Sequence, residues 1–165
     1  MRNRYAIIAA VTALVTLIDQ ATKVLVLHSI PLYTEIPVIK DFFSLVHVRN
    51  RGAAFGFLNR HDISWQFWLF LAATLVAIVV VIMLAKSSRA DDYPFFLSLG
   101  LILGGAAGNL IDRILYREVI DFLDFYWGTY HWPAFNVADI AICCGAALAL
   151  IFSLRRSPPA EKTGR

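Results

Sequence analysis

Four long apolar runs limit what this chain can fold into. They cover residues 5–27, 63–84, 94–115 and 133–154, and each approaches the roughly 20 residues that a helix needs to cross about 30 Å of hydrocarbon. Because a backbone in lipid must satisfy its own hydrogen bonds, we expect each run to form a helix. The many short alternating segments that build a transmembrane barrel do not occur in this sequence.

The composition agrees with a membrane domain. Hydrophobic residues make up 59% of the 165 residues, whereas ordinary soluble domains are about 45–50% apolar. We therefore predict an all-α membrane protein, with residues 1–165 as a single polytopic domain built on a four-transmembrane-helix bundle. No basic stripe marks a soluble face, so nucleic acid is not an expected partner. The N-terminal run lacks a convincing small-residue cleavage site, so we interpret it as an uncleaved first span.

Basic residues flank the runs unevenly. Arg2 and Arg4 precede the first run, Lys86 and Arg89 lie between the second and third, and the tail 155–165 is also basic. By the positive-inside rule these three segments belong in the cytoplasm, which predicts that both termini are cytoplasmic. The link 28–62 also carries four basic residues, which counts against this orientation, but that link is long and has folding signals of its own.

The link 28–62 is predicted to fold outside the bilayer. Phe42–Val48 is rich in β-formers and alternates imperfectly, so it indicates a strand. Arg49–Gly52 has the composition of a turn. The small, apolar stretch Ala53–Leu58 that follows is suited to lie on the membrane surface as a cradle or lid.

The fourth run contains a carboxylate, Asp139, about two turns inside its expected start at Pro133. A charge inside a span costs about 2.5–3.5 kcal/mol on insertion scales, so an intramembrane aspartate is by default a functional candidate. With four spans, the other polar residues near span ends fall on the same, non-cytoplasmic side. They are Asp19, Lys23, Asn50, Arg51, Asn109, Asp112, Arg113, Asp121 and Asp124.

Some of these polar residues also have a purely structural interpretation. Asp19 and Lys23 are spaced i, i+4, so they can pair on one helix face and neutralise each other, or they can also contact a substrate. The cluster at the end of the third run is open to a capping and ion-pair interpretation. Gly100, Gly104 and Gly108 form a small-xxx-small ridge that lets helices approach closely in lipid.

The motifs of other hydrolases are missing from the sequence. It has no His-Glu-x-x-His, no zinc-spaced cysteine–histidine cluster and no Gly-x-Ser-x-Gly elbow. Cys143 and Cys144 are neighbours in the fourth run and are interpreted as small hydrophobes without a disulfide. Neither a metal nor a cofactor is predicted. The remaining candidates are acids: two adjacent carboxyl groups share a proton and can hydrolyse a peptide by acid–base catalysis.

Three aspartates are candidates for the partner of Asp139. Asp112 lies beside Arg113, so we expect it to have a structural role. Asp121 is flanked by apolar residues and is the more desolvated candidate, while Asp124 stays open as an alternative.

Five segments, taken together and in this order, resemble the bacterial lipoprotein signal peptidases (signal peptidase II). The resemblance extends from Asp19 to the end of the fourth run, without a departure at a motif position. The matching segments are Asp19-Gln20-x-x-Lys23, Asn50-x-Gly52-Ala53-Ala54-Phe55, Gly104-Gly105-Ala106-x-Gly108-Asn109-x-x-Asp112-Arg113, Val119-Ile120-Asp121-Phe122 and Phe135-Asn136-x-Ala138-Asp139.

The resemblance implies an aspartic endopeptidase of the bacterial inner membrane, with its active site toward the outer face. Such an enzyme removes the signal peptide from diacylglyceryl-modified prolipoproteins on the N-terminal side of the lipidated cysteine. The family's catalytic dyad corresponds to Asp121 and Asp139. A small extracytoplasmic β-cradle, an interfacial helix, contact with membrane lipid and inhibition by globomycin are also implied. For such an enzyme, we expect the glycine ridge to leave room for a helical signal segment and lipid between the spans. The implied supporting residues are Asp19, Lys23, Asn50, Gly52, Asn109, Arg113 and Asn136.

Two other function classes compete with a peptidase. A proton-coupled small membrane transporter could use the same acids as a relay, but it needs polar residues through the full membrane depth. A structural assembly subunit could use Gly100, Gly104 and Gly108 as its docking face, but it does not need charges collected on one membrane side.

Overall fold

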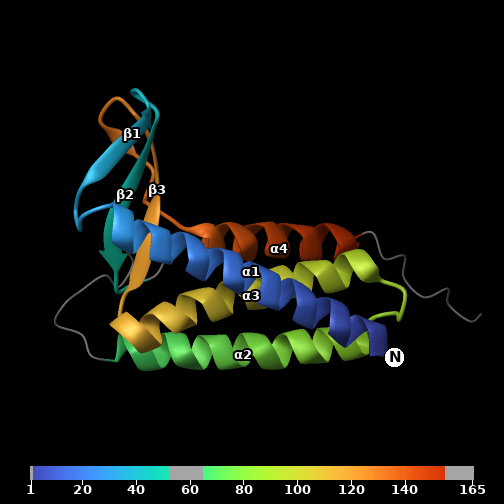
Figure 1. Cartoon of the computed structure of the whole chain (residues 1–165). Helices are drawn as coiled ribbons and strands as arrows, with labels where there is room; N and C mark the ends of the chain where they lie inside the picture. The colour runs from blue at the N-terminus through green and yellow to red at the C-terminus, as the bar shows by residue number, and fades with distance from the viewer. Residues whose placement is uncertain (1, 53–64, 155–165) are drawn as a thin grey trace, which may run out of the picture.

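The computed structural model describes residues 2–52 and 65–154. Its helices form an elongated bundle, and a small sheet stands at one end of it (Figure 1). The N-terminus and the turn between the second and third helices lie at the opposite end. In chain order the elements are α1 (Arg2–Ser29), β1 (Glu35–Ile39), β2 (Phe43–Asn50), α2 (Gln66–Ser87), α3 (Tyr93–Tyr116), β3 (Val119–Trp127), β4 (Tyr130–His131) and α4 (Val137–Leu154).

All four helices are long and apolar enough to cross a membrane. Most of their apolar surface faces outward: in the most apolar stretch of α2, only 6% of the residues are buried. Such a surface suits lipid, because lipid tails are as apolar as the side chains they cover. The predicted four-helix membrane fold with a small antiparallel sheet is confirmed.

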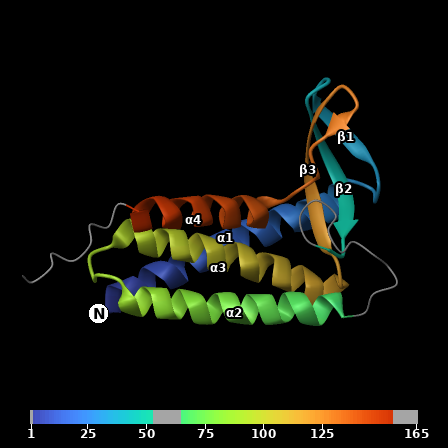
Figure 2. The same ribbon diagram turned by 180° about the vertical axis from the view of Figure 1, so that it is seen from behind.

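Helix α3 is the centre of the bundle and packs against the other three helices. It lies between α2 and α4 in both views (Figures 1 and 2). A Cβ atom added to Gly100 would lie 2.7 Å from Val11 Cβ, and one added to Gly104 would lie 2.6 Å from Val15 Cβ. The glycine ridge is therefore filled by α1. The expectation that it leaves room for a substrate helix is wrong, and the ridge is not free to dock a partner.

Polar side chains of α1 reinforce this close approach. Three of them, spaced four residues apart, donate hydrogen bonds to the carbonyl oxygens of the three ridge glycines. The constant offset of 88 residues between donor and acceptor requires α1 and α3 to run parallel. The bonds are Thr12 Oγ1 to Gly100 O at 3.3 Å, Thr16 Oγ1 to Gly104 O at 3.1 Å and Gln20 Nε2 to Gly108 O at 3.1 Å.

The sheet takes strands from both links at its end of the bundle. Its antiparallel order is β1-β2-β3-β4, so the cradle is built from residues 35–50 together with 119–131. The predicted strand over Phe42–Val48 is present but continues to Asn50, so the chain bends only at Arg51 and Gly52. The sequence had not indicated a strand at 119–127; pairing with β2 makes that segment extended. Pro37 is tolerated because β1 is an edge strand.

Strand β3 is anchored on the end of α1. Ile120 and Phe122 of β3 pack with Val26 and Ile30 in one buried apolar cluster. This cluster fixes the first half of β3 against the helices, and Asp121 lies between its two β3 members.

Helix α4 begins at Val137 rather than at Pro133. The backbone of Phe135 pairs with β3 instead: its N–H donates to Leu123 O at 3.1 Å, and its carbonyl accepts from Leu123 N at 2.9 Å. As a result Asp139 lies in the first turn of α4, not two turns inside the helix as predicted. The predicted lid or interfacial helix at 53–58 and the predicted tail 155–165 lie outside the described residues.

Candidate active site

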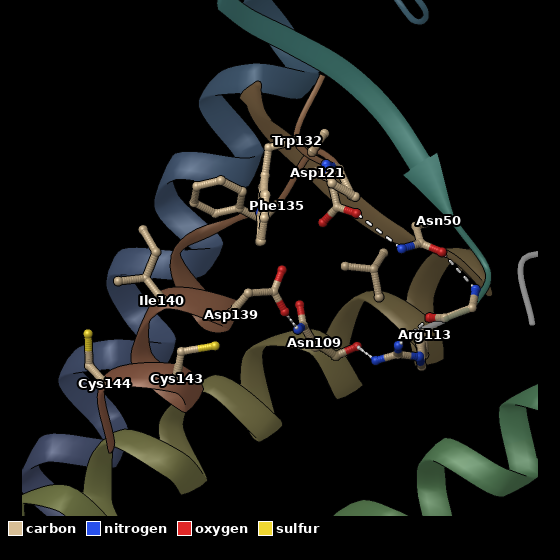
Figure 3. Close-up of a pocket in the computed structure, with 14 residues that line it drawn as sticks. Asn50, Asn109, Arg113, Asp121, Trp132, Phe135, Asp139, Ile140, Cys143 and Cys144 are labelled. Atoms are coloured by element: carbon tan, nitrogen blue, oxygen red, sulfur yellow. Dashed lines mark hydrogen bonds between the residues drawn. The ribbon is translucent and has the colours of Figure 1, made fainter. Parts of the chain in front are cut away.

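A cavity of about 330 Å³ opens where β3, α3 and α4 meet, below the sheet (Figure 3). Polar side chains gather at one part of its wall, and exposed side chains of α4 continue the wall along that helix. The lining residues are Asn50, Gly52, Asn109, Arg113, Val119, Asp121, Trp132, Pro133, Ala134, Phe135, Asp139, Ile140, Cys143 and Cys144.

Asp139 is held by the cap of its own helix. Asn136 occupies the N-cap position, where its Oδ1 accepts from Asp139 N at 3.0 Å and its backbone N–H donates to Asp139 Oδ2 at 3.2 Å. This reciprocal pair is a capping box, with an aspartate in the place of the usual glutamate. Asn109 Nδ2 donates to the other oxygen, Oδ1, at 2.9 Å. The carboxylate therefore has a fixed direction toward the cavity.

Asp121 comes to the same cavity from β3. Its Oδ1 accepts from Asn136 Nδ2 at 2.7 Å and its Oδ2 accepts from Asn50 Nδ2 at 3.3 Å. The residue is 3% exposed. Burial, and next the negative charge of Asp139, raise the pKa of Asp121 from 3.8 to about 7.

The structure thus brings Asp121 and Asp139 together and separates them from the other two candidates. Both carboxyl groups point into the cavity from different elements (Figure 3). Asp124 pairs with His131, whose Nδ1 lies 2.9 Å from Asp124 Oδ2, and it does not line the cavity. Asp112 is also absent from the cavity wall. Two carboxyl groups held together in a buried site share protons, which suits them to acid–base chemistry.

Asp19 and Lys23 form the predicted pair, with Lys23 Nζ 2.8 Å from Asp19 Oδ2. Lys23 also pairs with Asp112, at 2.9 Å from Oδ2. Asp112 therefore has the expected structural role, but its partner is Lys23 rather than its neighbour Arg113. All three side chains are at most 1% exposed, and none lines the cavity.

Arg113 links the end of β2 to α3. Its Nη2 donates to Gly52 O at 3.1 Å, and its Nη1 donates to Asn109 O at 3.2 Å. The guanidinium also lies 4.1 Å from the ring centroid of Phe70 on α2. Gly52 N in turn donates to Asn50 Oδ1 at 2.8 Å, so the bend after β2 helps to orient Asn50. Within residues 2–52 and 65–154, no three His, Cys, Asp or Glu side chains gather to hold a metal ion.

The apolar wall of the cavity was not predicted from the sequence. Cys143 and Cys144 are free, exposed thiols that line it beside Ile140. The signal was available, because Cys143 stands four residues after Asp139 and so lies on the same face of a helix. The pattern Asn136-x-x-Asp139 could likewise have located the start of α4.

Comparison with known proteins identifies the family. The family model described as signal peptidase (SPase) II matches residues 11–155. The lipoprotein signal peptidase of Nitratidesulfovibrio vulgaris is 56% identical over 156 residues, covering 94% of both chains. That of Geobacter metallireducens is 50% identical over 155 residues, again covering 94% of both. The chain belongs to the signal peptidase II family.

Solved structures support the same assignment. A bacterial membrane enzyme solved by the in meso method at 2.3 Å resolution matches with a TM-score of 0.81 and 26% identity, covering 96% of this chain and 93% of that one. A second such enzyme, at 1.9 Å, gives a TM-score of 0.79 and 27% identity, covering 91% and 94%. The family resemblance read from the five segments is confirmed. This signal peptidase II family member is a multi-span membrane protease, which sets aside the transporter and assembly-subunit hypotheses.

Proposed function

We propose that this chain removes the signal peptide from diacylglyceryl-modified prolipoproteins, cutting on the N-terminal side of the lipidated cysteine, with Asp121 and Asp139 as its catalytic dyad. The dyad assignment is supported by one observation: both carboxyl groups face the same cavity and accept hydrogen bonds from the same residue, Asn136. Membership of the signal peptidase II family supports the substrate class.

The two carboxyl groups differ in their surroundings, which suggests their roles. Asp121 has a pKa raised to about 7 and is suited to carry the shared proton and donate it to the scissile carbonyl oxygen. Asp139 faces the same cavity, with its two oxygens held by Asn109 and Asn136, and is placed to take a proton from the attacking water. In the tetrahedral diol that results, the C–N bond breaks as Asp139 passes its proton to the leaving amine nitrogen. Asp121 takes a proton back from one diol hydroxyl, which re-forms the carbonyl and restores the shared proton of the dyad.

Apart from Asp19 and Lys23, the predicted supporting residues fall into two groups. Asn50, Asn109 and Asn136 hold the carboxyl groups directly, while Gly52 and Arg113 hold the bend that orients Asn50. We propose that this first group positions the dyad and that Arg113, which lines the cavity, also contacts the polar part of the substrate.

The apolar wall along α4 suggests where the acyl chains run. Ile140, Cys143 and Cys144 continue the cavity along α4 from the dyad. A lipidated cysteine keeps its acyl chains in the membrane, so its scissile bond reaches the dyad at the bilayer boundary. Membrane lipid would contact the same wall, and an inhibitor of the globomycin type would occupy the cavity in place of the substrate.

We further propose an inner-membrane location with the active site toward the outer face and both termini in the cytoplasm. Arg4 donates to Ala85 O at 2.7 Å and to Ser88 O at 3.3 Å, so the basic N-terminal flank and the α2–α3 turn are joined at the end opposite the sheet. A basic end of this kind favours the cytoplasmic side.

The test is cleavage of a diacylglyceryl-modified prolipoprotein by the purified full chain in detergent. Asp121→Asn and Asp139→Asn should each lower kcat by at least about 10⁴-fold, because removing one member of a coupled catalytic unit costs nearly as much as removing all of it. Both variants should still elute as folded protein.

Asp124→Asn is the matched control. Asp124 is on the same strand as Asp121 but pairs with His131 away from the cavity, so its variant should keep wild-type kcat. Turnover retained by either dyad variant would contradict the proposed dyad. Loss of turnover in Asp124→Asn, with turnover retained in Asp121→Asn, would identify Asp124 as the partner of Asp139.

A further inference from the structure

Lys23 is the centre of a buried polar cluster beneath the cavity. Its Nζ lies 2.8 Å from Asp19 Oδ2 and 2.9 Å from Asp112 Oδ2, and it donates to Asn109 Oδ1 at 2.9 Å. An ammonium group has three N–H donors, so all of them are used. Because Lys23 is 1% exposed and does not line the cavity, it has no free donor for a substrate.

The two carboxylates bound to Lys23 each hold a second group. Asp19 Oδ1 accepts from the backbone N–H of Ala138 at 2.9 Å, and Asp112 Oδ2 accepts from the backbone N–H of Ile120 at 3.1 Å. Each of these backbone groups belongs to the residue directly before one carboxyl of the dyad. A single ammonium therefore ties together the two backbone segments, β3 and the start of α4, that present the dyad.

Two amide side chains complete the cluster. Gln20 Nε2 donates to Asp112 Oδ1 at 2.9 Å and to Asp19 Oδ2 at 3.2 Å, so it bridges the same two carboxylates. Asn109 turns its oxygen to Lys23, which leaves its Nδ2 to donate to Asp139 Oδ1. Asn136 Nδ2 donates to the same Asn109 oxygen at 3.1 Å, so Lys23 and Asn136 together hold the Asn109 amide with its nitrogen toward Asp139.

We propose that Lys23, Asp19 and Asp112, bridged by Gln20, form a buried strut that sets the separation and orientation of the two dyad carboxyl groups. These are positioning residues rather than substrate-binding residues, and the proposal rests on the proposed dyad. The strut is rigid because a buried carboxylate that loses its cation is strongly disfavoured, so neither backbone segment can move away from Lys23.

The test uses the full chain in detergent with a diacylglyceryl-modified prolipoprotein. Gln20→Met removes a neutral donor from both carboxylates but leaves the ion pairs, and should lower kcat about 10-fold with KM changed less than about 2-fold. Lys23→Met removes the strut and should lower kcat about 100-fold or more in the protein that elutes as folded, because small misplacements of reacting groups cost this much.

The pH profile separates positioning from a general loss of stability. The charge of Lys23 lowers the pKa of Asp121, so Lys23→Met should move the alkaline limb of kcat to higher pH. The other groups that face Asp121 are Asp139, Asn50, Asn136 and Arg113, and they stay unchanged in this variant.

Thr16→Val is the matched control. It removes the Thr16 Oγ1 to Gly104 O bond one turn away on the same α1–α3 interface, and should keep wild-type kcat and pH profile. The strut proposal would be overturned if Gln20→Met has the same kcat as Thr16→Val, or if it raises KM and leaves kcat unchanged. This outcome decides the question even if Lys23→Met does not fold. Asp121→Asn in the same assay separates the two proposals: if it retains turnover, the dyad itself is wrong.

Discussion

The side-chain amide of Asn136 donates a hydrogen bond to Asp121 Oδ1 across 2.7 Å. The same residue caps α4 and, through its backbone N–H, holds Asp139 Oδ2 at 3.2 Å. Asn136 is 0% exposed, so water does not compete for these bonds. One residue therefore joins the two carboxyl groups and starts the helix that carries one of them.

Asn136 allows its two roles to be separated by substitution. Asn136→Ser keeps a good N-cap but loses the amide that reaches Asp121, so kcat should fall about 100-fold with thermal stability nearly unchanged. Asn136→Ala loses the cap as well and should lower the free energy of unfolding by about 1 kcal/mol more. Both are measured by prolipoprotein cleavage and thermal unfolding in detergent. Wild-type kcat in Asn136→Ser would show that the amide has no part in the dyad.

The raised pKa of Asp121 predicts how activity depends on pH. Below about 7 the dyad keeps its shared proton, and above about 7 Asp121 loses it. Proton donation to the scissile carbonyl then fails, so kcat should fall as the pH rises through this value. A pH profile of kcat in detergent measures this. Full activity two pH units above 7 would contradict the proposed donor role of Asp121.

The same pKa shift has a consequence for stability. A carboxyl whose pKa is raised on folding binds its proton more tightly in the folded state, so its contribution to stability is complete below 3.8 and is lost as the pH rises to about 7. Asp121→Asn, which stays neutral, should therefore be less pH-sensitive than the wild type over this range. Thermal unfolding at several pH values compares the two. If the unfolding temperatures of the wild type and Asp121→Asn changed with pH in the same way, ionisation of Asp121 would not be what limits stability.

The glycine ridge predicts two variants with equal packing defects and different effects on activity. A Cβ at Gly104 would meet Val15 Cβ at 2.6 Å, whereas one at Gly108 would meet the carboxylate of Asp19. Overpacking of this kind costs about 1–3 kcal/mol, so Gly104→Ala and Gly108→Ala should both unfold at lower temperature. Only Gly108→Ala should also lower the kcat of the folded fraction, because it displaces an arm of the strut. Equal kcat values in the two variants would contradict this.

The apolar wall of the cavity predicts a variant that affects substrate binding. Cys143→Phe fills part of the cavity of about 330 Å³ one turn from Asp139. It should raise KM by about 10-fold with little change in kcat, as expected for a lost binding contact. Leu150→Phe is the control, since Leu150 is also exposed on α4, at 61%, but does not line the cavity. If Leu150→Phe raised KM as much as Cys143→Phe, the effect would not come from substrate contact with the cavity wall.

Features that depend on local spacing and hydropathy could be predicted from the amino-acid sequence. The four spans follow from runs of apolar residues, because a helix in lipid is recognised by length and hydropathy alone. The pairing of Asp19 with Lys23 follows from the i, i+4 spacing. The family follows from the order of five short segments, whose residue types and spacing can be read without a structure.

Which side chains meet in the cavity depends on how the helices and strands pack together. The sequence left Asp112, Asp121 and Asp124 open, and the register of β3 against β2 and the packing of α4 brought Asp121 to Asp139. The later start of α4 came from pairing between Phe135 and β3. These outcomes depend on contacts between segments far apart in the chain, and such contacts leave no periodic pattern in either segment alone.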